Sequence, residues 1–498
     1  MYCFLPSDRQ KAFSFIAYRK NKIKQKITAS SLLVLIMVLG SILALFYQSW
    51  ILAFGKFTFV PSLFLLGLLL SPWGHIRLGE KAEKLPLIQW FIKISAANLI
   101  LMGLIAAGIV AFVGSGPSYI QPPVNVIDAL KMFYLTQWGL FPWAIYGLWG
   151  VCLAYFSYHK NYPPFPHCCS NSLFQGFFEP ELKAFIEGSV FLVNVLAITL
   201  SIAASVLLVI YSLEIYFSLF SYLIFPAITV LLLSFITPIF YFKFNAHSAR
   251  RIARTLPLSL SRLLLGGWGI MVVTLLLGGL FSSWLLPQLP TQHQLGSSEC
   301  EKMLGAFNKF NYKFSLFYWS WLLIWTPLAG SWLASISKGR SLRELVLGIF
   351  FMPLLIAVVG YAALPSDIVW EKISLGLNQP WVLLSLGIFN LITILMLTRN
   401  QFNSQLLMAG FMPLGDAYRG ARTQLKYGAK LIGSTKFAHV ILITLLTVVM
   451  MHTLGGWYIL TIQFSLAGLL IIFFIYMSLL ALVAQCKIDN KNKSPDES

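Results

Sequence analysis

The apolar stretch TQWGLFPWAIYGLWGVCLAYFSYHKNY, at residues 136–162, contains aromatic side chains that could bind a cation. On a helix, Trp143 lies about 140° from Trp138, and Tyr146 lies between them, so the three rings share one face. A cation without N–H groups cannot donate hydrogen bonds and is held instead by ring faces, each contributing roughly 0.5–2 kcal/mol when desolvated. The spacing fits such a site, and it also fits an interfacial aromatic belt that serves helix packing.

A second aromatic group lies far along the chain, in FSLFYWSWLLIWTPLAG at residues 314–330. It contains three tryptophans: Trp319, Trp321 and Trp325. Pro327 follows them, as Pro142 lies within the first group, and proline inside a helix removes a hydrogen bond and kinks the helix. Two interrupted aromatic helices from distant parts of a chain are what a binding site between two structural repeats would supply.

The composition is that of a membrane protein. Of the 498 residues, 58% are hydrophobic and 11% are charged, whereas a soluble protein carries roughly 25% charged residues. The long apolar runs are continuous rather than alternating, which favours helices over a β-barrel. The sequence predicts an all-α polytopic membrane protein with about twelve spans of roughly 20 residues each. They are 31–50, 57–75, 93–113, 130–157, 188–212, 217–242, 262–286, 313–336, 345–364, 381–398, 437–455 and 457–484.

The net charge of +19 follows the predicted topology. All but six of the 36 Lys and Arg residues lie in segments that face the cytoplasm if the N-terminus does, which predicts that both termini are cytoplasmic. Residues 1–30 then form a basic tail, residues 31–484 one transmembrane domain and residues 485–498 a short C-terminal tail. The charge is interpreted as a topology and lipid-headgroup signal, so we expect membrane lipids and no nucleic acid as partners.

Patterns typical of catalysis or metal binding are missing from the sequence. It contains no HExxH, GxSxG or phosphate-binding loop, and no pair of carboxylates in the middle of a predicted span. The six cysteines are scattered, without a CxxC pair. We therefore predict no enzyme activity, no catalytic residues, no metal site and no cofactor, and a membrane enzyme is the most remote alternative.

The two aromatic stretches resemble the fourth and eighth spans of the betaine/choline/carnitine transporter family. The more specific match is FYWSWLLIWTPLAGSWLASISKGRSLRELVLG, and weaker matches extend to residues 194–205 and 455–468. The resemblance implies two peripheral helices followed by an inverted five-helix repeat of the leucine-transporter type, at about 93–286 and 313–484. It also implies a homotrimer that moves quaternary ammonium compounds by alternating access in a bacterial inner membrane.

Carried over by position, the resemblance assigns the substrate site to rings from both spans. The residues are Trp138, Trp143, Tyr146, Trp321 and Trp325. The family has WAWW where this chain has WSWL, so Leu322 replaces one ring, which weakens the expected affinity for a trimethylammonium group. The unwound glycine-rich stretch of the family's third span corresponds to GLIAAG, at residues 103–108. Its small residues include Gly103, Ala106 and Gly108.

Two places bear on the coupling ion. Ser201 and Ser205 hold the i, i+4 hydroxyl spacing at which the resemblance implies sodium ligands, and oxygen ligands suit a hard cation. The alternative is that both serines ease helix packing. In the tenth span, TRNQFNS at 398–404 keeps Thr398 but places Arg399 at a ligand position, where a guanidinium would repel sodium and could replace it. Alternatively, Arg399 marks the end of the span and snorkels outward.

The leading hypothesis is a secondary transporter, by symport or exchange, of glycine betaine, choline, carnitine or a similar zwitterion. Both Na⁺ and H⁺ remain open as coupling ions. Leu322 and the altered tenth span favour two alternatives. One is a diverged member of the family that carries another small amphipathic solute, and the other is a non-transporting sensor or scaffold on the same fold.

Overall fold

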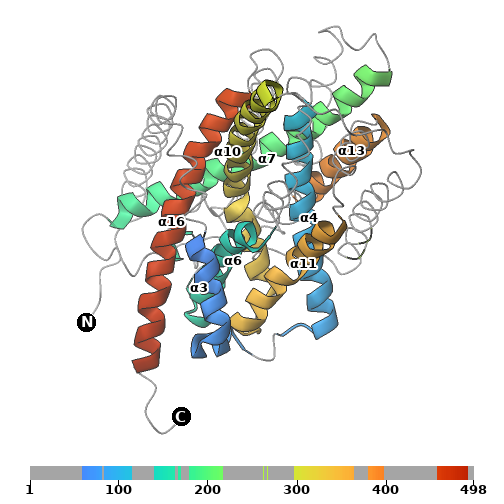
Figure 1. Cartoon of the computed structure of the whole chain (residues 1–498). Helices are drawn as coiled ribbons and strands as arrows, with labels where there is room; N and C mark the ends of the chain where they lie inside the picture. Colours follow the sequence, from blue (N-terminus) through green and yellow to red (C-terminus); the bar gives the residue numbers. More distant parts are fainter. Residues whose placement is uncertain are drawn as a thin grey trace, which may run out of the picture.

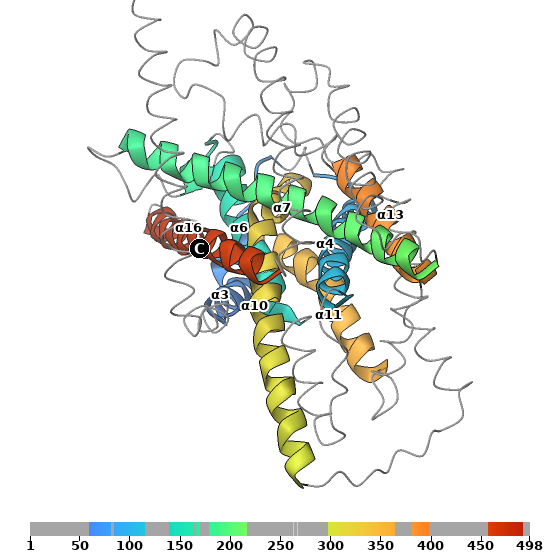
Figure 2. The ribbon, with the colours of Figure 1, turned by 90° about the horizontal axis from the view of Figure 1, so that it is seen from above.

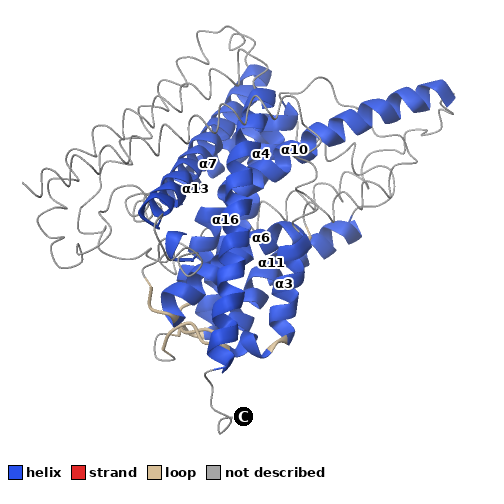
Figure 3. Ribbon diagram, turned by 90° about the vertical axis from the view of Figure 1, so that its left-hand side faces the viewer, coloured by secondary structure: helices blue, strands red, loops and turns tan. Residues whose placement is uncertain are grey.

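The computed structural model describes residues 59–80, 84–114, 139–162, 166–169, 179–216, 297–363, 380–397 and 457–491, with isolated helical positions at 262 and 266. Within these ranges the regular structure is helical, and the only β pairing is a single bridge between Arg77 and Ser341 (Figure 3). The long helices are α3 (Phe59–Leu70), α4 (Leu87–Gly114), α6 (Leu140–Ala154), α7 (Glu179–Tyr216), α10 (Ser297–Ile336), α11 (Leu342–Ala363), α13 (Pro380–Leu397) and α16 (Trp457–Lys491). Short helical turns are η1 (Pro72–His75), η4 (Tyr155–His159) and η5 (Pro166–Cys169).

Eight of the twelve predicted spans coincide with a long helix of the described part of the chain. The other four, 31–50, 217–242, 262–286 and 437–455, fall outside it apart from two isolated positions. By length and composition, Leu87–Gly108 and Leu470–Ile488 could each cross a membrane, and shorter apolar helices lie at Val60–Leu70, Leu200–Leu213 and Trp381–Ile394. The helices α7 and α10 begin well before their predicted spans, because the polar segments 179–188 and 297–312 continue the same helices.

The core lies where α4, α6, α7 and α10 meet. The helices α10 and α11 each pack on both α4 and α6, while α7 lies across this group and has α13 alongside it (Figures 1 and 2). The C-terminal helix α16 packs along α10. On the outer face of α11 a row of large apolar side chains is exposed, which suits contact with lipid. They are Leu347, Phe351, Leu354, Leu355 and Val358.

The helices α6 and α10 are in backbone contact where they cross. A Cβ atom placed on Gly330 would lie 2.8 Å from the backbone nitrogen of Gly150, so neither position has room for a side chain. Eight residues after each of these glycines, the Lys338 ammonium lies 5.8 Å from the ring centre of Tyr158. Because the two contacts follow in the same order, α6 and α10 run parallel. Residues that precede the crossing on either helix therefore lie on the same side of it.

The two prolines occupy different positions in their helices. The helix α6 begins at Leu140, so Pro142 lies in its first turn, where a backbone N–H has no acceptor within the helix. Pro142 therefore does not kink the described helix. Pro327 lies inside α10, which continues as helix to Ile336. The hydroxyl of Thr326 donates to the Leu322 carbonyl at 3.3 Å, one position from the bond that the proline removes.

Candidate functional site

The aromatic residues of the two spans are buried on the same side of the α6–α10 crossing. Trp143 and Tyr146 precede Gly150 on α6, and Trp321 and Trp325 precede Gly330 on α10. None of these four side chains is more than 1% exposed, and Leu322 is fully buried in the same core. Trp138, the remaining predicted ring, lies outside the described residues.

The α6 rings carry polar atoms that the core does not satisfy. Trp143 and Tyr146 pack edge to face, with ring centres 5.5 Å apart. The indole nitrogen of Trp143 and the hydroxyl of Tyr146 are both buried, and neither has a hydrogen-bond partner among the described residues. An unpaired buried donor costs about 1–3 kcal/mol. Two such donors beside ring faces suit a ligand that combines a cationic group with an oxygen acceptor.

The Trp321 indole lies directly on α4. A Cβ atom placed on Gly108 would come within 2.5 Å of Cε2 of Trp321, so only glycine fits here. The stretch expected to be unwound is helical throughout, because α4 runs from Leu87 to Gly114 and includes Gly103 and Ala106. The expectation of unwinding is therefore wrong for this structure. The reason is that the absent side chain at Gly108 gives space to an indole, and α4 keeps its backbone hydrogen bonds.

Trp325 points toward a different helix. Its indole N–H donates to the Ser201 hydroxyl at 3.2 Å, and that hydroxyl donates to the Ala197 carbonyl at 2.8 Å. One turn further along α7, the Ser205 hydroxyl donates to the Ser201 carbonyl at 2.6 Å and accepts a hydrogen bond from Asn390 of α13 at 2.7 Å. Ser201 therefore contacts the aromatic core, and Ser205 connects α7 to α13. The predicted sodium ligation by these two hydroxyls stays a prediction.

Asn390 is a residue that the sequence reasoning missed. It lies in the apolar run 381–398 and is fully buried. The signal was present, because an amide in the middle of a predicted span is costly unless it has a partner, and such residues mark functional positions. Thr398 and Arg399, the predicted ion-site residues that follow α13 in the sequence, lie outside the described residues.

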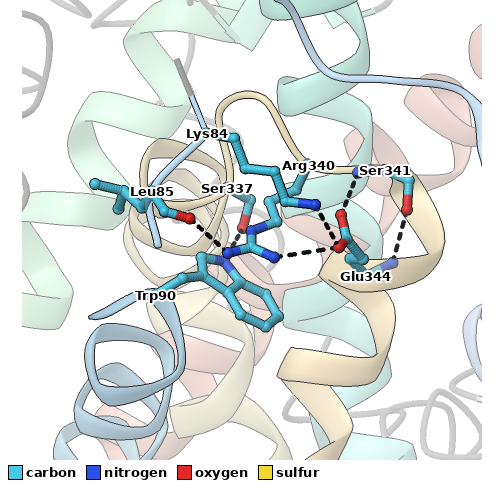
Figure 4. A network of polar contacts seen from close by, with 7 residues as sticks. All are labelled: Lys84, Leu85, Trp90, Ser337, Arg340, Ser341 and Glu344. Atoms are coloured by element: carbon cyan, nitrogen blue, oxygen red, sulfur yellow. Dashed lines mark hydrogen bonds and ion pairs between the residues drawn. The ribbon is translucent and has the colours of Figure 1, made fainter. Parts of the chain in front are cut away.

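A second polar cluster joins the end of α10 to the segment before α4 (Figure 4). Arg340 is 1% exposed, and its guanidinium lies 4.5 Å from the ring centre of Trp90. It donates to the Leu85 carbonyl at 2.7 Å and to Glu344 at 3.1 Å, and Lys84 donates to the same carboxylate oxygen at 2.8 Å. One arginine therefore connects three parts of the fold through a ring face, a carbonyl and a carboxylate.

The first turn of α11 is closed by a reciprocal cap. The Glu344 carboxylate accepts from the Ser341 backbone N–H at 3.0 Å, and the Ser341 hydroxyl accepts from the Glu344 backbone N–H at 3.2 Å. This is the capping box that a Ser-x-x-Glu sequence forms at a helix start. Glu344 therefore stabilises α11 itself as well as the connection to Lys84 and Arg340.

Backbone pairing holds the same two loops together. Leu78 donates to the Arg340 carbonyl at 2.8 Å and accepts from Gly339 at 2.6 Å. Gly339 has a φ of 79°, and a Cβ there would lie 2.7 Å from the Lys84 nitrogen, so glycine is required on both counts. His159 contacts the Arg77 carbonyl at 3.2 Å. Three segments predicted to face the cytoplasm thus lie together at one end of the helices.

The Glu344 cluster predicts a weak acid sensitivity. Partial burial raises the pKa of Glu344, but the hydrogen bonds from Lys84 and Ser341 and the charges of Lys84 and Arg340 lower it further, so the net shift is downward. Because the pKa of Glu344 is lowered in the folded protein, its ionised carboxylate stabilises the fold. This contribution is complete above the ordinary Glu pKa, about 4.3, and is lost as the pH falls below it. The effect is small, because the side chain is 34% exposed and solvent screens it.

We therefore expect the thermal unfolding temperature of the wild-type protein to fall more between pH 6 and pH 4 than that of Glu344→Gln. The glutamine variant keeps the size of the side chain and removes its titration. Equal losses in the two proteins would show that Glu344 contributes nothing that depends on its charge. Repeating the measurement in high salt should shrink the difference.

Comparisons with family models and with individual proteins point to the same family. A family model described as BCCT, betaine/carnitine/choline family transporter, matches residues 28–367. The chain is 23% identical over 310 residues to the glycine betaine transporter OpuD of Bacillus subtilis, covering 60% of this chain and 59% of the relative. It is 24% identical over 324 residues to the high-affinity choline transport protein of Escherichia coli, covering 61% and 45%. It is 24% identical over 310 residues to the betaine/ectoine transporter LcoP of Corynebacterium glutamicum, covering 58% and 47%. The matched region thus spans roughly half the length of these relatives.

Proposed function

The chain belongs to the betaine/carnitine/choline transporter family, and we propose that it moves a quaternary ammonium compound, or a related zwitterion, across the bacterial cytoplasmic membrane. The observation that carries the proposal is the buried aromatic core before the α6–α10 crossing, with its unpaired donors. The names of similar proteins, which include glycine betaine and choline transporters, support the same class of solute.

The two ends of such a solute are proposed to bind to different groups of the protein. The onium group lies against ring faces, which attract a cation that has no N–H donor. The rings come from both predicted spans: Trp138, Trp143, Tyr146, Trp321 and Trp325. The carboxylate or hydroxyl of the solute accepts hydrogen bonds from the Trp143 indole and the Tyr146 phenol, which lack other partners in the described part of the chain. Binding thereby removes the cost of leaving two buried donors unpaired.

The mechanism proposed is alternating access by a secondary transporter. All four described rings are buried in this conformation, so a solute could reach them only after the helices move. The proposal includes twelve helices, two inverted repeats at about 93–286 and 313–484, a homotrimer and cytoplasmic termini. Immediately after α13 in the sequence, Arg399 is proposed to replace a sodium ligand beside Thr398, so that sodium coupling at that position is lost. Exchange or proton coupling then drives net movement.

Leu322 supports a second candidate within transport. It is fully buried in the aromatic core and offers no ring face to a cation. A diverged family member with another small amphipathic solute would tolerate this change. A sensor or scaffold that binds without transport is the further alternative, and it would keep the aromatic core while failing to move the solute.

Uptake and binding in proteoliposomes test the proposal. Choline, glycine betaine and carnitine are each measured with a sodium gradient, a proton gradient or none, and tryptophan fluorescence reports binding in the same preparation. We expect saturable binding of at least one of the three compounds and counterflow without sodium. Binding without uptake or exchange would favour the sensor, and no binding by a folded protein would overturn the quaternary ammonium assignment.

A further inference from the structure

The serine pair of α7 lies between two N–H donors. From one side the Trp325 indole of α10 donates to Ser201, and from the other the Asn390 amide of α13 donates to Ser205. Each serine hydroxyl in turn donates to a backbone carbonyl of α7. Each hydroxyl oxygen therefore has its own proton and accepts a second one.

This arrangement is unfavourable for a cation. A metal ion held by both hydroxyl oxygens would lie beside two N–H groups whose hydrogens carry partial positive charge. In a buried, low-dielectric interface that repulsion is poorly screened. The hydrogen bonds at 2.7 Å and 3.2 Å would have to break before the oxygens could act as paired ligands.

The backbone of α13 also closes the space around Ser205. A Cβ atom placed on Gly387 would lie 2.8 Å from the Ser205 carbonyl oxygen and 3.1 Å from Leu208. Gly387 precedes Asn390 by three residues, so both lie on the face of α13 that meets α7. The helices α7 and α13 are therefore in direct contact one turn from the amide.

We propose that the Ser201–Ser205 pair is a cation-free hydrogen-bonding junction, and that Asn390 is the residue that excludes sodium from it by giving Ser205 an N–H donor. The inference deepens the proposed transport function and rests on it, because the choice of ion has meaning only for a coupled transporter. Asn390 also carries a buried amide oxygen that has no partner among the described residues. A carboxylate at this position would replace the donor with anionic oxygen, which suits a hard cation.

The test measures sodium binding directly on the purified full chain and needs no solute. The thermal unfolding temperature is measured in NaCl and in KCl of equal concentration, at pH 8 so that an introduced carboxylate is ionised. We expect the wild type and Ser205→Ala to show the same difference between the two salts. We expect Asn390→Asp to gain a stabilisation specific to sodium, about 1–3 °C, since a ligand that binds the folded state raises the unfolding temperature.

Two further variants make the outcome decisive. Ser205→Ala added to Asn390→Asp should remove the sodium effect, because the hydroxyl would be one of the new ligands. Thr393→Val is the matched control, since Thr393 is a buried hydroxyl on the same helix that bonds to the Phe389 carbonyl. A sodium effect in the wild type that Ser205→Ala abolishes would overturn the proposal, as would a folded Asn390→Asp protein with no sodium effect. Failure of the proposed function itself would be seen separately, as absence of solute binding in proteoliposomes.

Discussion

Replacing Trp143 with leucine is expected to weaken the binding of an onium solute by up to about 30-fold, which corresponds to about 2 kcal/mol for a desolvated ring face. The substitution also removes the indole N–H, which is buried and has no partner in the described structure. Both losses fall on the bound state, because in the free protein that N–H makes no hydrogen bond. Titration of choline or glycine betaine, followed by calorimetry, measures the change.

Trp149→Leu is the matched control for this prediction. Trp149 lies on the same helix, is 1% exposed and also has an unpaired indole nitrogen. It faces the α6–α10 crossing, where its Cδ1 lies 2.6 Å from the Cβ that a residue at Gly330 would carry. Both variants should lose thermal stability, since each empties part of the core. Only Trp143→Leu should lose affinity, and equal affinity in the two variants would refute the aromatic site.

Replacing Arg340 with methionine is expected to lower the free energy of unfolding by about 3 kcal/mol. The change leaves the Leu85 carbonyl without the guanidinium donor, removes the stacked cation from Trp90 and leaves Glu344 with fewer partners. Breaking a buried charged cluster from one side costs about 3–5 kcal/mol, and the exposure of Glu344 places this case at the lower end. Thermal unfolding at neutral pH in detergent measures the loss.

Lys338→Met is the control that removes an exposed positive charge in place of the buried one. Lys338 is exposed on the same loop, and its ammonium contacts the Tyr158 ring at 5.8 Å. A solvated contact of this kind contributes about 0.5–1 kcal/mol. The loss of unfolding free energy in Arg340→Lys should lie between those of Lys338→Met and Arg340→Met. Lysine keeps the charge but lacks the planar guanidinium that reaches two acceptors. Similar losses for Lys338→Met and Arg340→Met would contradict the role given to Arg340.

The burial of the aromatic residues in one core could be predicted because their residue types are informative without their partners, whereas their role in binding stays a prediction. Trp143 and Tyr146 share a face through helical periodicity alone, and the apolar runs gave helix positions that the described helices match. What lies opposite each ring could not be predicted. Trp321 meets Gly108 from more than two hundred residues away, and no local pattern encodes which glycine an indole will cover.

The errors have the same physical origin. Pro142 was expected to kink a helix because the apolar run continues on both sides of it, yet α6 begins two residues before it. Gly103 and Ala106 were expected to unwind, but small residues also allow close packing, and tertiary contact decides between the two uses. Asn390 and Glu344 act through partners on other helices, so their roles follow from the fold rather than from their neighbours in sequence.

The crossing of α6 and α10 has a mechanical consequence. Where Gly150 meets Gly330, the two backbones touch with no side chain between them. The rings of Trp143 and Trp321 lie roughly 10–14 Å before this point along their helices, and the Tyr158–Lys338 contact lies about 12 Å after it. A rotation of about 10° would displace each end by about 2 Å in opposite directions. A rotation of α6 against α10 about the glycine contact would therefore move the rings and the Tyr158–Lys338 contact in opposite directions.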